Sequence, residues 1–117
     1  MAMSRASTTS DVFNAIAEPR RREIVAMLAG GDPRSVGELV NEMKLAQPAV
    51  SKHLAVLRAV GVVSVQKVGK SRLYALNAAE LKPVYDWIHQ FERLWTNQLD
   101  RIKQRAERKA KERSQRN

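Results

Sequence analysis

The stretch from Ser35 to Gly61 constrains the fold more than any other part of this chain, because it reads as two short helices joined by a tight turn. Ser35 is followed three residues later by Glu38, the pattern of a capping box that satisfies free backbone N–H groups at a helix start. The apolar residues of this first helix share one helical face: Val36, Leu39, Val40 and Met43. Residues 44–46 form the predicted turn.

The second helix of the pair is predicted to begin at Gln47 and Pro48, because proline is tolerated in a first turn. Its inward residues are predicted to be Val50, Leu54 and Leu57, with Gly61 as the C-cap. The outward face carries small, polar and basic side chains: Gln47, Ala49, Ser51, Lys52, His53 and Val56. Such side chains suit the major groove of DNA, where glutamine reads adenine and an alanine methyl touches thymine. This is a candidate helix-turn-helix, although amphipathic helices with a solvated outer face also occur in many other domains.

After Gly61 the apolar period changes from helical to alternating, which predicts a β-hairpin over residues 63–76 with a turn at residues 68–71. Lys67, Lys70 and Arg72 lie at its tip and flanks, where they can grip phosphates. Lysine on an exposed hairpin also serves simply to prevent pairing with other strands. A hairpin that directly follows a reading helix is the order of elements in a winged helix.

Two helices are predicted before the helix-turn-helix. The first begins at a cap among Thr8, Thr9 and Ser10 and ends at Pro19, and the second runs from Pro19 to the glycines at 30–31. The arginines at 20–22 lie outward, either as phosphate contacts or as a solvated basic face.

The C-terminal region is predicted to form one long helix from about Ala78, with Asn77 and Glu80 as its cap. Its apolar and aromatic face is too long for so small a body to cover, and large exposed patches of this kind mark interfaces. We therefore expect a homodimer with these interface residues: Phe13, Leu81, Tyr85, Ile88, Phe91, Trp95 and Leu99. The alternative is a ligand pocket lined by aromatic side chains: Tyr85, Trp87, Phe91 and Trp95.

Composition sets the class of protein. A chain of 117 residues with 44% hydrophobic and 28% charged residues predicts a single globular domain. The absence of a long apolar run, of a signal-like N-terminus and of cysteine predicts a cytoplasmic protein with no membrane association. The net charge of +9 indicates a polyanionic partner, but residues 101–117 alone carry +6 of it. We expect residues 1–103 to form the DNA-binding and dimerisation domain, and residues 104–117 a basic tail that is partly helical or frayed.

These residues resemble a known family, the arsenic-repressor (ArsR) family of bacterial transcriptional regulators. Its recognition helix and wing look like the run AQPAVSKHLAVLRAVGVVSVQKVGKSRLYALN, and its preceding helix looks like AEPRRREIVAML. The resemblance covers about Asp11 to Trp95. It implies a mostly α-helical winged helix-turn-helix fold, with four to five helices, a two-stranded wing and a long C-terminal dimerisation helix. It also implies a dimeric repressor of a palindromic operator, often its own, whose recognition helix binds double-stranded DNA through Gln47, Pro48, Ser51, Lys52 and His53.

This chain departs from the family pattern at the positions where many members bind the effector that releases them from DNA. Many members bind metal through cysteines at positions that match Ser35 and Gly37 here. Others use two Asp/His pairs on the last helix. This chain has Asp86 with His89 three residues on, and Leu99 and Ile102 at the positions of the second pair. The chain therefore looks like a cysteine-free subgroup, and we expect no metal and no cofactor. The resemblance leaves open whether a small-molecule effector exists.

Enzymatic activity is not expected from this sequence. It has two histidines, and His53 diverges from Ser51 on one helix, so the two cannot form a base–nucleophile pair. No glycine-rich phosphate loop is present. The alternatives to a sequence-reading repressor are a non-specific nucleic-acid-binding protein and a winged-helix module that binds protein.

Overall fold

The computed structural model describes residues 12–116, and the helix start predicted among residues 8–10 lies outside them. The chain divides into two units, Met1–Val84 and Tyr85–Asn117. Within the described residues, no helix is long and apolar enough to cross a membrane.

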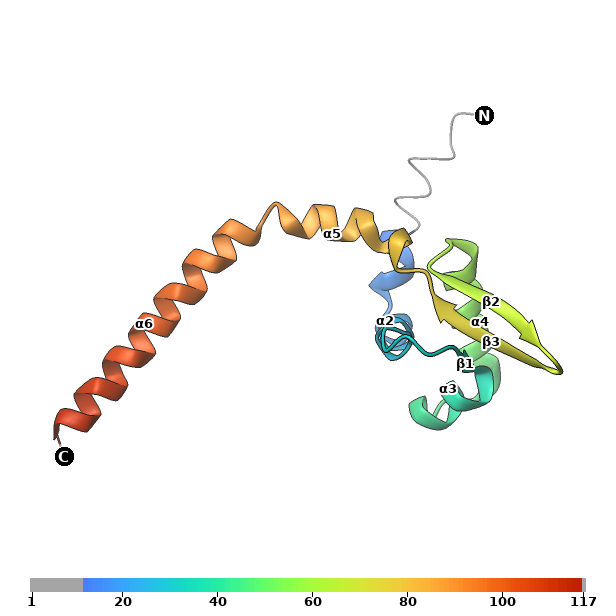
Figure 1. The fold of residues 1–117 in the computed structure, drawn as a ribbon, viewed down its shortest axis with the longest axis horizontal. Helices are drawn as coiled ribbons and strands as arrows, with labels where there is room; N and C mark the ends of the chain where they lie inside the picture. Colours follow the sequence, from blue (N-terminus) through green and yellow to red (C-terminus); the bar gives the residue numbers. More distant parts are fainter. Residues whose placement is uncertain (1–11, 117) are drawn as a thin grey trace. The chain divides into compact units, whose positions relative to one another are not determined.

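The first unit is a winged helix-turn-helix, as the sequence predicts. A helix at residues 12–17 precedes the labelled elements: α2 (Pro19–Leu28), β1 (Arg34–Ser35), α3 (Val36–Met43), α4 (Gln47–Ala59), β2 (Val63–Val68), β3 (Ser71–Leu76) and the 3-10 helix η1 (Ala78–Leu81). The β2–β3 hairpin extends outward beyond the helices (Figure 1).

One cluster of buried side chains holds the first unit together. It includes every inward residue predicted for α4, together with apolar residues of the other helices and of the sheet: Val12, Ala15, Ile24, Leu28, Leu39, Met43, Val50, Leu54, Leu57, Val62, Val63 and Tyr74. Each large aliphatic side chain in such a core contributes about 1.5–3 kcal/mol through removal from water. This core fixes α4 by its inner face and leaves its outer face free for another partner.

The tight turn between α3 and α4 is built by local signals. The capping box forms as predicted, with the Ser35 hydroxyl accepting from the Glu38 N–H at 3.2 Å and the Glu38 carboxylate accepting from the Ser35 N–H at 3.1 Å. At the other end of α3, Lys44 adopts a left-handed conformation with φ of 56°, and its N–H donates to the Val40 carbonyl. This conformation reverses the chain so that α4 begins three residues later.

The start of α4 has no side-chain cap. Ala46 already has the extended backbone of an N-cap, and its carbonyl accepts from the Ala49 N–H at 3.0 Å. We expect Ala46→Ser to raise the free energy of unfolding by about 0.5–2 kcal/mol, because a hydroxyl would satisfy an N–H in the first turn. Thermal denaturation of the two proteins measures the change. Ser35→Ala, which removes the existing cap of α3, is the reverse control and is expected to lower the melting temperature; an unchanged or lower value for Ala46→Ser would contradict the expectation.

The sheet has three strands where the sequence predicts two. Its order is β1-β3-β2, and every pair is antiparallel. Strand β1 pairs Arg34 with Tyr74 and Ser35 with Leu73. A strand of two residues has no alternation that a sequence can display, and its pairing comes only from the tertiary fold. It ties the start of α3 to the wing.

The long C-terminal helix that the sequence predicts is present, but its predicted start near Ala78 is wrong, because the structure divides this span. Helix α5 (Lys82–His89) and helix α6 (Glu92–Arg116) are separated by a turn at Gln90 and Phe91. The Gln90 amide donates to the Trp87 carbonyl at 2.9 Å, which satisfies a carbonyl that the interrupted helix would leave open. The predicted cap is wrong as well: Asn77 makes no capping bond, and its side chain donates to the Gly61 carbonyl at 3.2 Å.

Helix α6 runs without interruption through residues 103 and 104, where we expected the domain to end and a tail to begin. The two units divide between Val84 and Tyr85, and the expected boundary at residue 103 stays a prediction. The basic residues of the expected tail therefore stand on a regular helix, which gives them fixed positions around its circumference.

Candidate nucleic-acid interface

The outer face of α4 presents most of the residues that the sequence predicts to contact DNA. Gln47, Pro48, Ser51 and Lys52 are exposed, while the opposite face of α4 is buried in the core. The helix begins at Gln47 itself, so Gln47 and Ser51 both lie in its first two turns. Side chains at the front of a recognition helix are those that reach base edges in the major groove.

His53 does not share this outer face, which corrects the expectation from the sequence. Its side chain is 21% exposed, and its Nδ1 lies 3.8 Å from a carboxylate oxygen of Glu18. Glu18 is the N-cap of α2 and accepts from the Arg21 N–H at 3.0 Å. His53 therefore lies beside the start of α2, on the flank of α4 that turns toward the core.

The wing places three cations on its exposed surface. Lys67 and Arg72 are direct cross-strand partners, and Lys70 stands in the turn beside Gly69, whose φ of +62° requires glycine-like freedom. Like charges directly opposite one another destabilise an antiparallel pair. None of the three forms an ion pair within the part of the chain that the structure describes. An arrangement of this kind suits a polyanion that neutralises it on binding.

A hollow of about 440 Å³ lies between α4 and β3 and joins the two halves of the interface. It brings together Ser51 of α4 and Arg72 of the wing, which are 21 positions apart in the sequence. Its lining also includes Tyr74 and Arg58, an exposed residue that the sequence analysis missed. Arg58 lies seven residues after Ser51, a helical spacing that places both on one side of α4 and was the available signal.

The arginines at the start of α2 all interact with other groups of the first unit. Arg20 pairs with Glu23 at 3.0 Å. Arg21 donates to the carbonyls of residues 14 and 15, and Arg22 to those of residues 16 and 17. These carbonyls belong to the end of the preceding helix, which lacks intrahelical donors there. Arg21 and Arg22 therefore cap the end of the preceding helix. The sequence left open whether they contact phosphate or form a solvated face, and in the free protein both donate to backbone carbonyls instead.

The second unit presents a large exposed apolar surface. Its members, together called the apolar stripe, are Tyr85, Ile88, Trp95, Leu99 and Ile102. Between them Phe91 is half-buried and contacts the rings of Trp87 and Trp95, with centroids 5.3 and 6.5 Å away. Two other predicted interface residues belong to the first unit: Leu81 packs against its core, and Phe13 is half-buried.

The aromatic residues of the alternative ligand site do not enclose one pocket. A hollow of about 250 Å³ is lined by Tyr85 and Trp95 together with Ile88, His89 and Glu92, but not by Trp87 or Phe91.

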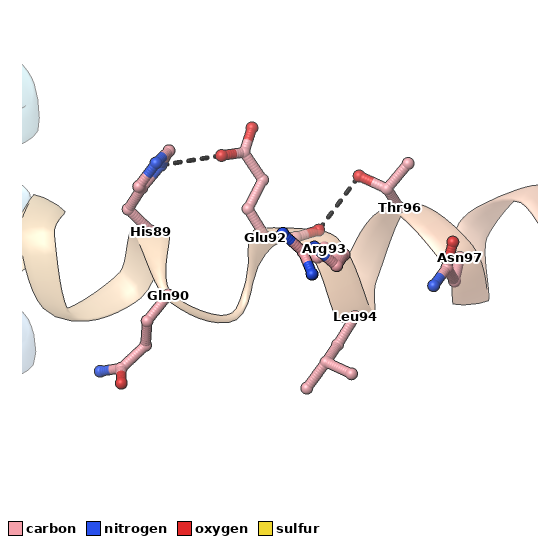
Figure 2. Close-up of a pocket in the computed structure, with 7 residues that line it drawn as sticks. All are labelled: His89, Gln90, Glu92, Arg93, Leu94, Thr96 and Asn97. Carbon is pink, nitrogen blue, oxygen red and sulfur yellow. Dashed lines mark hydrogen bonds and ion pairs between the residues drawn. The ribbon is translucent and has the colours of Figure 1, made fainter.

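A hollow of the second unit lies at the turn between α5 and α6 (Figure 2). It measures about 680 Å³, and its polar groups are partly engaged with one another. His89 Nδ1 lies 2.8 Å from the Glu92 carboxylate, and the Thr96 hydroxyl donates to the Glu92 carbonyl at 3.0 Å. Figure 2 shows Gln90 and Leu94 pointing away from this pair. The described residues contain no group of three or more side chains able to hold a metal.

The fold and the site together define a winged helix-turn-helix protein with an exposed reading helix and a basic wing. The family described as "Bacterial regulatory protein, arsR family" matches residues 18–65. The chain is 32% identical over 90 residues to the transcriptional repressor SdpR of Bacillus subtilis, an alignment that covers 77% of this chain and 99% of SdpR. It is 37% identical over 78 residues to the transcriptional activator HlyU of Vibrio cholerae, covering 67% of this chain and 71% of HlyU.

Solved structures agree with this relationship. An ArsR-like transcriptional regulator from Rhodococcus sp. RHA1 superposes with a TM-score of 0.64 at 30% identity, covering 85% of this chain and 92% of that one. HlyU from Vibrio cholerae N16961 superposes with a TM-score of 0.62 at 32% identity, covering 76% and 96%. The chain belongs to the ArsR family of bacterial regulatory proteins, and the resemblance read from its sequence is confirmed.

Proposed function

We propose that this protein represses transcription by binding as a homodimer to a palindromic operator, whose bases it reads through α4. One observation carries the proposal: the exposed face of α4 occurs together with a wing whose cations are not neutralised by acidic side chains of the described residues. Gln47 and Ser51 supply base readout, and Lys52, Arg58 and the wing supply phosphate contacts. The named relatives are regulators of transcription, so we propose no catalytic activity.

The apolar stripe supports the homodimer. The exposed fractions of its side chains are large, including 62% for Tyr85 and 63% for Leu99. A second copy of the same stripe, related by a two-fold axis, would cover these side chains in a self-complementary interface. Two recognition helices related in this way would meet two equivalent half-sites, which is why the operator is proposed to be palindromic.

The proposal of repression favours one of two activities found among relatives. SdpR is named a repressor and HlyU an activator, so the family alone does not decide the sign of regulation. The alignment with SdpR spans nearly all of that protein, and this coverage supports repression. A reporter gene behind the DNA upstream of this protein's own gene tests the sign: expression that falls when the protein is supplied supports repression, and expression that rises overturns it.

Binding to the same upstream DNA tests sequence reading. The full chain is titrated against that duplex and against a scrambled duplex of equal length at physiological salt. We expect a preference of about a thousandfold or more for the upstream DNA, as specific regulators show. Equal affinity for the two duplexes would overturn base reading by α4.

The wing residues are expected to contact phosphate. Lys70→Ala and Arg72→Ala should each reduce the slope of log affinity against log salt by about one unit, because each removes one phosphate contact. The preference for upstream over scrambled DNA should change little. Arg20→Ala removes a cation already paired with Glu23 and serves as the control, with an unchanged slope. A slope that also stays unchanged in both wing variants would place the wing away from DNA.

A further inference from the structure

The C-terminal half of α6 carries a basic face that the winged helix does not use. Arg101, Gln104, Arg105 and Arg108 line one hollow of about 200 Å³, so their side chains project from the same side of the helix. Their spacing of three, four and seven residues is that of neighbours on a helical face. All four are exposed. The three arginines span about 10 Å along the helix axis, at a rise of about 1.5 Å per residue.

These arginines are not neutralised within the protein. Arg101, Arg105 and Arg108 form no ion pair with any residue that the structure describes, whereas Arg20 and Arg34 of the first unit pair with Glu23 and Glu42. Like charges four residues apart destabilise a helix. A bound polyanion would relieve this repulsion.

The surroundings of the three arginines indicate which polyanion fits. A helix that lies in a membrane surface needs a large apolar face, but Ile102 is the last large apolar residue of α6. Single-stranded nucleic acid is bound by interleaved aromatic side chains, and the last aromatic residue of the chain is Trp95. The planar guanidinium group of arginine can donate two parallel hydrogen bonds to two oxygens of one phosphate. Binding to the phosphodiester backbone of a duplex requires only such guanidinium groups on an exposed helix.

We propose that Arg101, Arg105 and Arg108 bind the backbone of double-stranded DNA without regard to sequence, as a contact separate from α4 and the wing. The proposal shares its ligand with the proposed function but does not rest on base reading. Glu112 follows Arg108 by four residues on the same face and weakens the contact, so its removal strengthens binding.

The test compares two triple variants of the full chain that lose the same charge. The first is Arg101→Gln, Arg105→Gln, Arg108→Gln, and the second is Lys103→Gln, Ala110→Glu, Arg113→Gln, whose positions lie on the other side of α6; each variant lowers the net charge by three. Glutamine has nearly the helix propensity of arginine and lysine, so α6 is retained, which circular dichroism checks. Affinity for a mixed-sequence duplex of about 30 base pairs is measured between about 50 and 200 mM salt.

We expect the slope of log affinity against log salt to fall by about 2.7 units in the first variant, since each phosphate contact contributes about 0.9. The control should change by less than about one unit. Glu112→Gln should raise the affinity. Equal losses in both triple variants would show that only bulk charge matters, and no loss in the first would place α6 off DNA; either result overturns the proposal. So would a loss seen with single-stranded poly(U) but not with the duplex.

The ratio of affinities for upstream and scrambled DNA separates this proposal from the proposed function. We expect the first triple variant to keep that ratio, because its contacts carry no sequence information. If the unmodified protein shows no preference but the first variant still loses salt dependence, base reading fails and the α6 contact stands. If the preference is present but the first variant binds like the unmodified protein, the α6 contact fails and base reading stands.

Discussion

Replacing Trp95 by glutamate is expected to convert the proposed dimer into a monomer and to remove most of its affinity for the proposed operator. Trp95 is 46% exposed in the single chain, and Leu99 and Ile102 follow it on the same face of α6 with exposed fractions above 60%. A tryptophan at the centre of an interface contributes about 2 kcal/mol or more. A two-fold dimer contains it twice, so the dissociation constant of the dimer should rise by about a thousandfold.

The loss of operator affinity follows from the loss of the dimer. Two recognition helices on one dimer bind two half-sites in a single event, and this avidity is worth about a hundredfold or more. A monomer keeps the contacts of one half-site only. Sedimentation at concentrations near those of the binding titration measures the oligomeric state, and titration with the upstream duplex measures the affinity of the same sample.

Asn97→Glu is the matched control for Trp95→Glu. It adds the same charge to the same helix, but residue 97 lies across α6 from the apolar stripe and is exposed. We expect this variant to remain a dimer. Its new carboxylate stands four residues before Arg101, so the oligomeric state is the readout for which it serves as the control. A dimer that survives Trp95→Glu would contradict the proposed interface and would move the contact between copies to another surface.

The elements that the sequence predicts correctly are those with local physical causes. The capping box of Ser35 and Glu38 concerns two residues three positions apart, and the buried positions of α4 follow from helical spacing alone. The hairpin follows from alternation and from a glycine with positive φ at its turn. Each of these signals is complete within a few residues and needs no knowledge of the rest of the fold.

The elements that the sequence misses depend on contacts between distant residues. His53 lies toward Glu18, which is 35 positions earlier and outside α4. The spacing of His53 from Val50 and Leu57 was a local signal that it flanks the buried face, but its partner could not be read from α4 alone. The hollow shared by Arg58 and Arg72 requires α4 and β3 to be brought together. The turn at Gln90 and Phe91 contains neither proline nor glycine, so no residue in it marks the end of a helix.

The position of His53 reduces the number of residues on α4 that are candidates for base readout. With His53 turned toward α2, the polar side chains at the front of α4 that remain exposed are Gln47, Ser51 and Lys52. Lysine 52 offers a single flexible cation, which suits a phosphate or a guanine. Gln47 and Ser51 lie one helical turn apart and are the neutral hydrogen-bonding groups of this face, so they are expected to carry most of the discrimination.

Gln47→Ala combined with Ser51→Ala is therefore expected to remove the preference for upstream DNA while leaving general DNA affinity nearly intact. A good contact with a base edge discriminates by about 1–3 kcal/mol, so the two together should reduce the preference by about 30-fold to about 20,000-fold, which at the upper end removes a thousandfold preference entirely. Both side chains are exposed in the free protein, and their loss should not disturb the core. The measurement is the ratio of affinities for the upstream and scrambled duplexes at one salt concentration.

Asn41→Ala is the control for this double variant, because Asn41 is an exposed polar residue of α3 and lies outside the proposed reading face. Its ratio of affinities should match that of the unmodified protein, even if its overall affinity falls. A double variant that weakens binding to both duplexes equally would mean that Gln47 and Ser51 contact the backbone. Sequence reading would then have to come from the shape of the DNA, since a protein can also select a site by the energy needed to deform it.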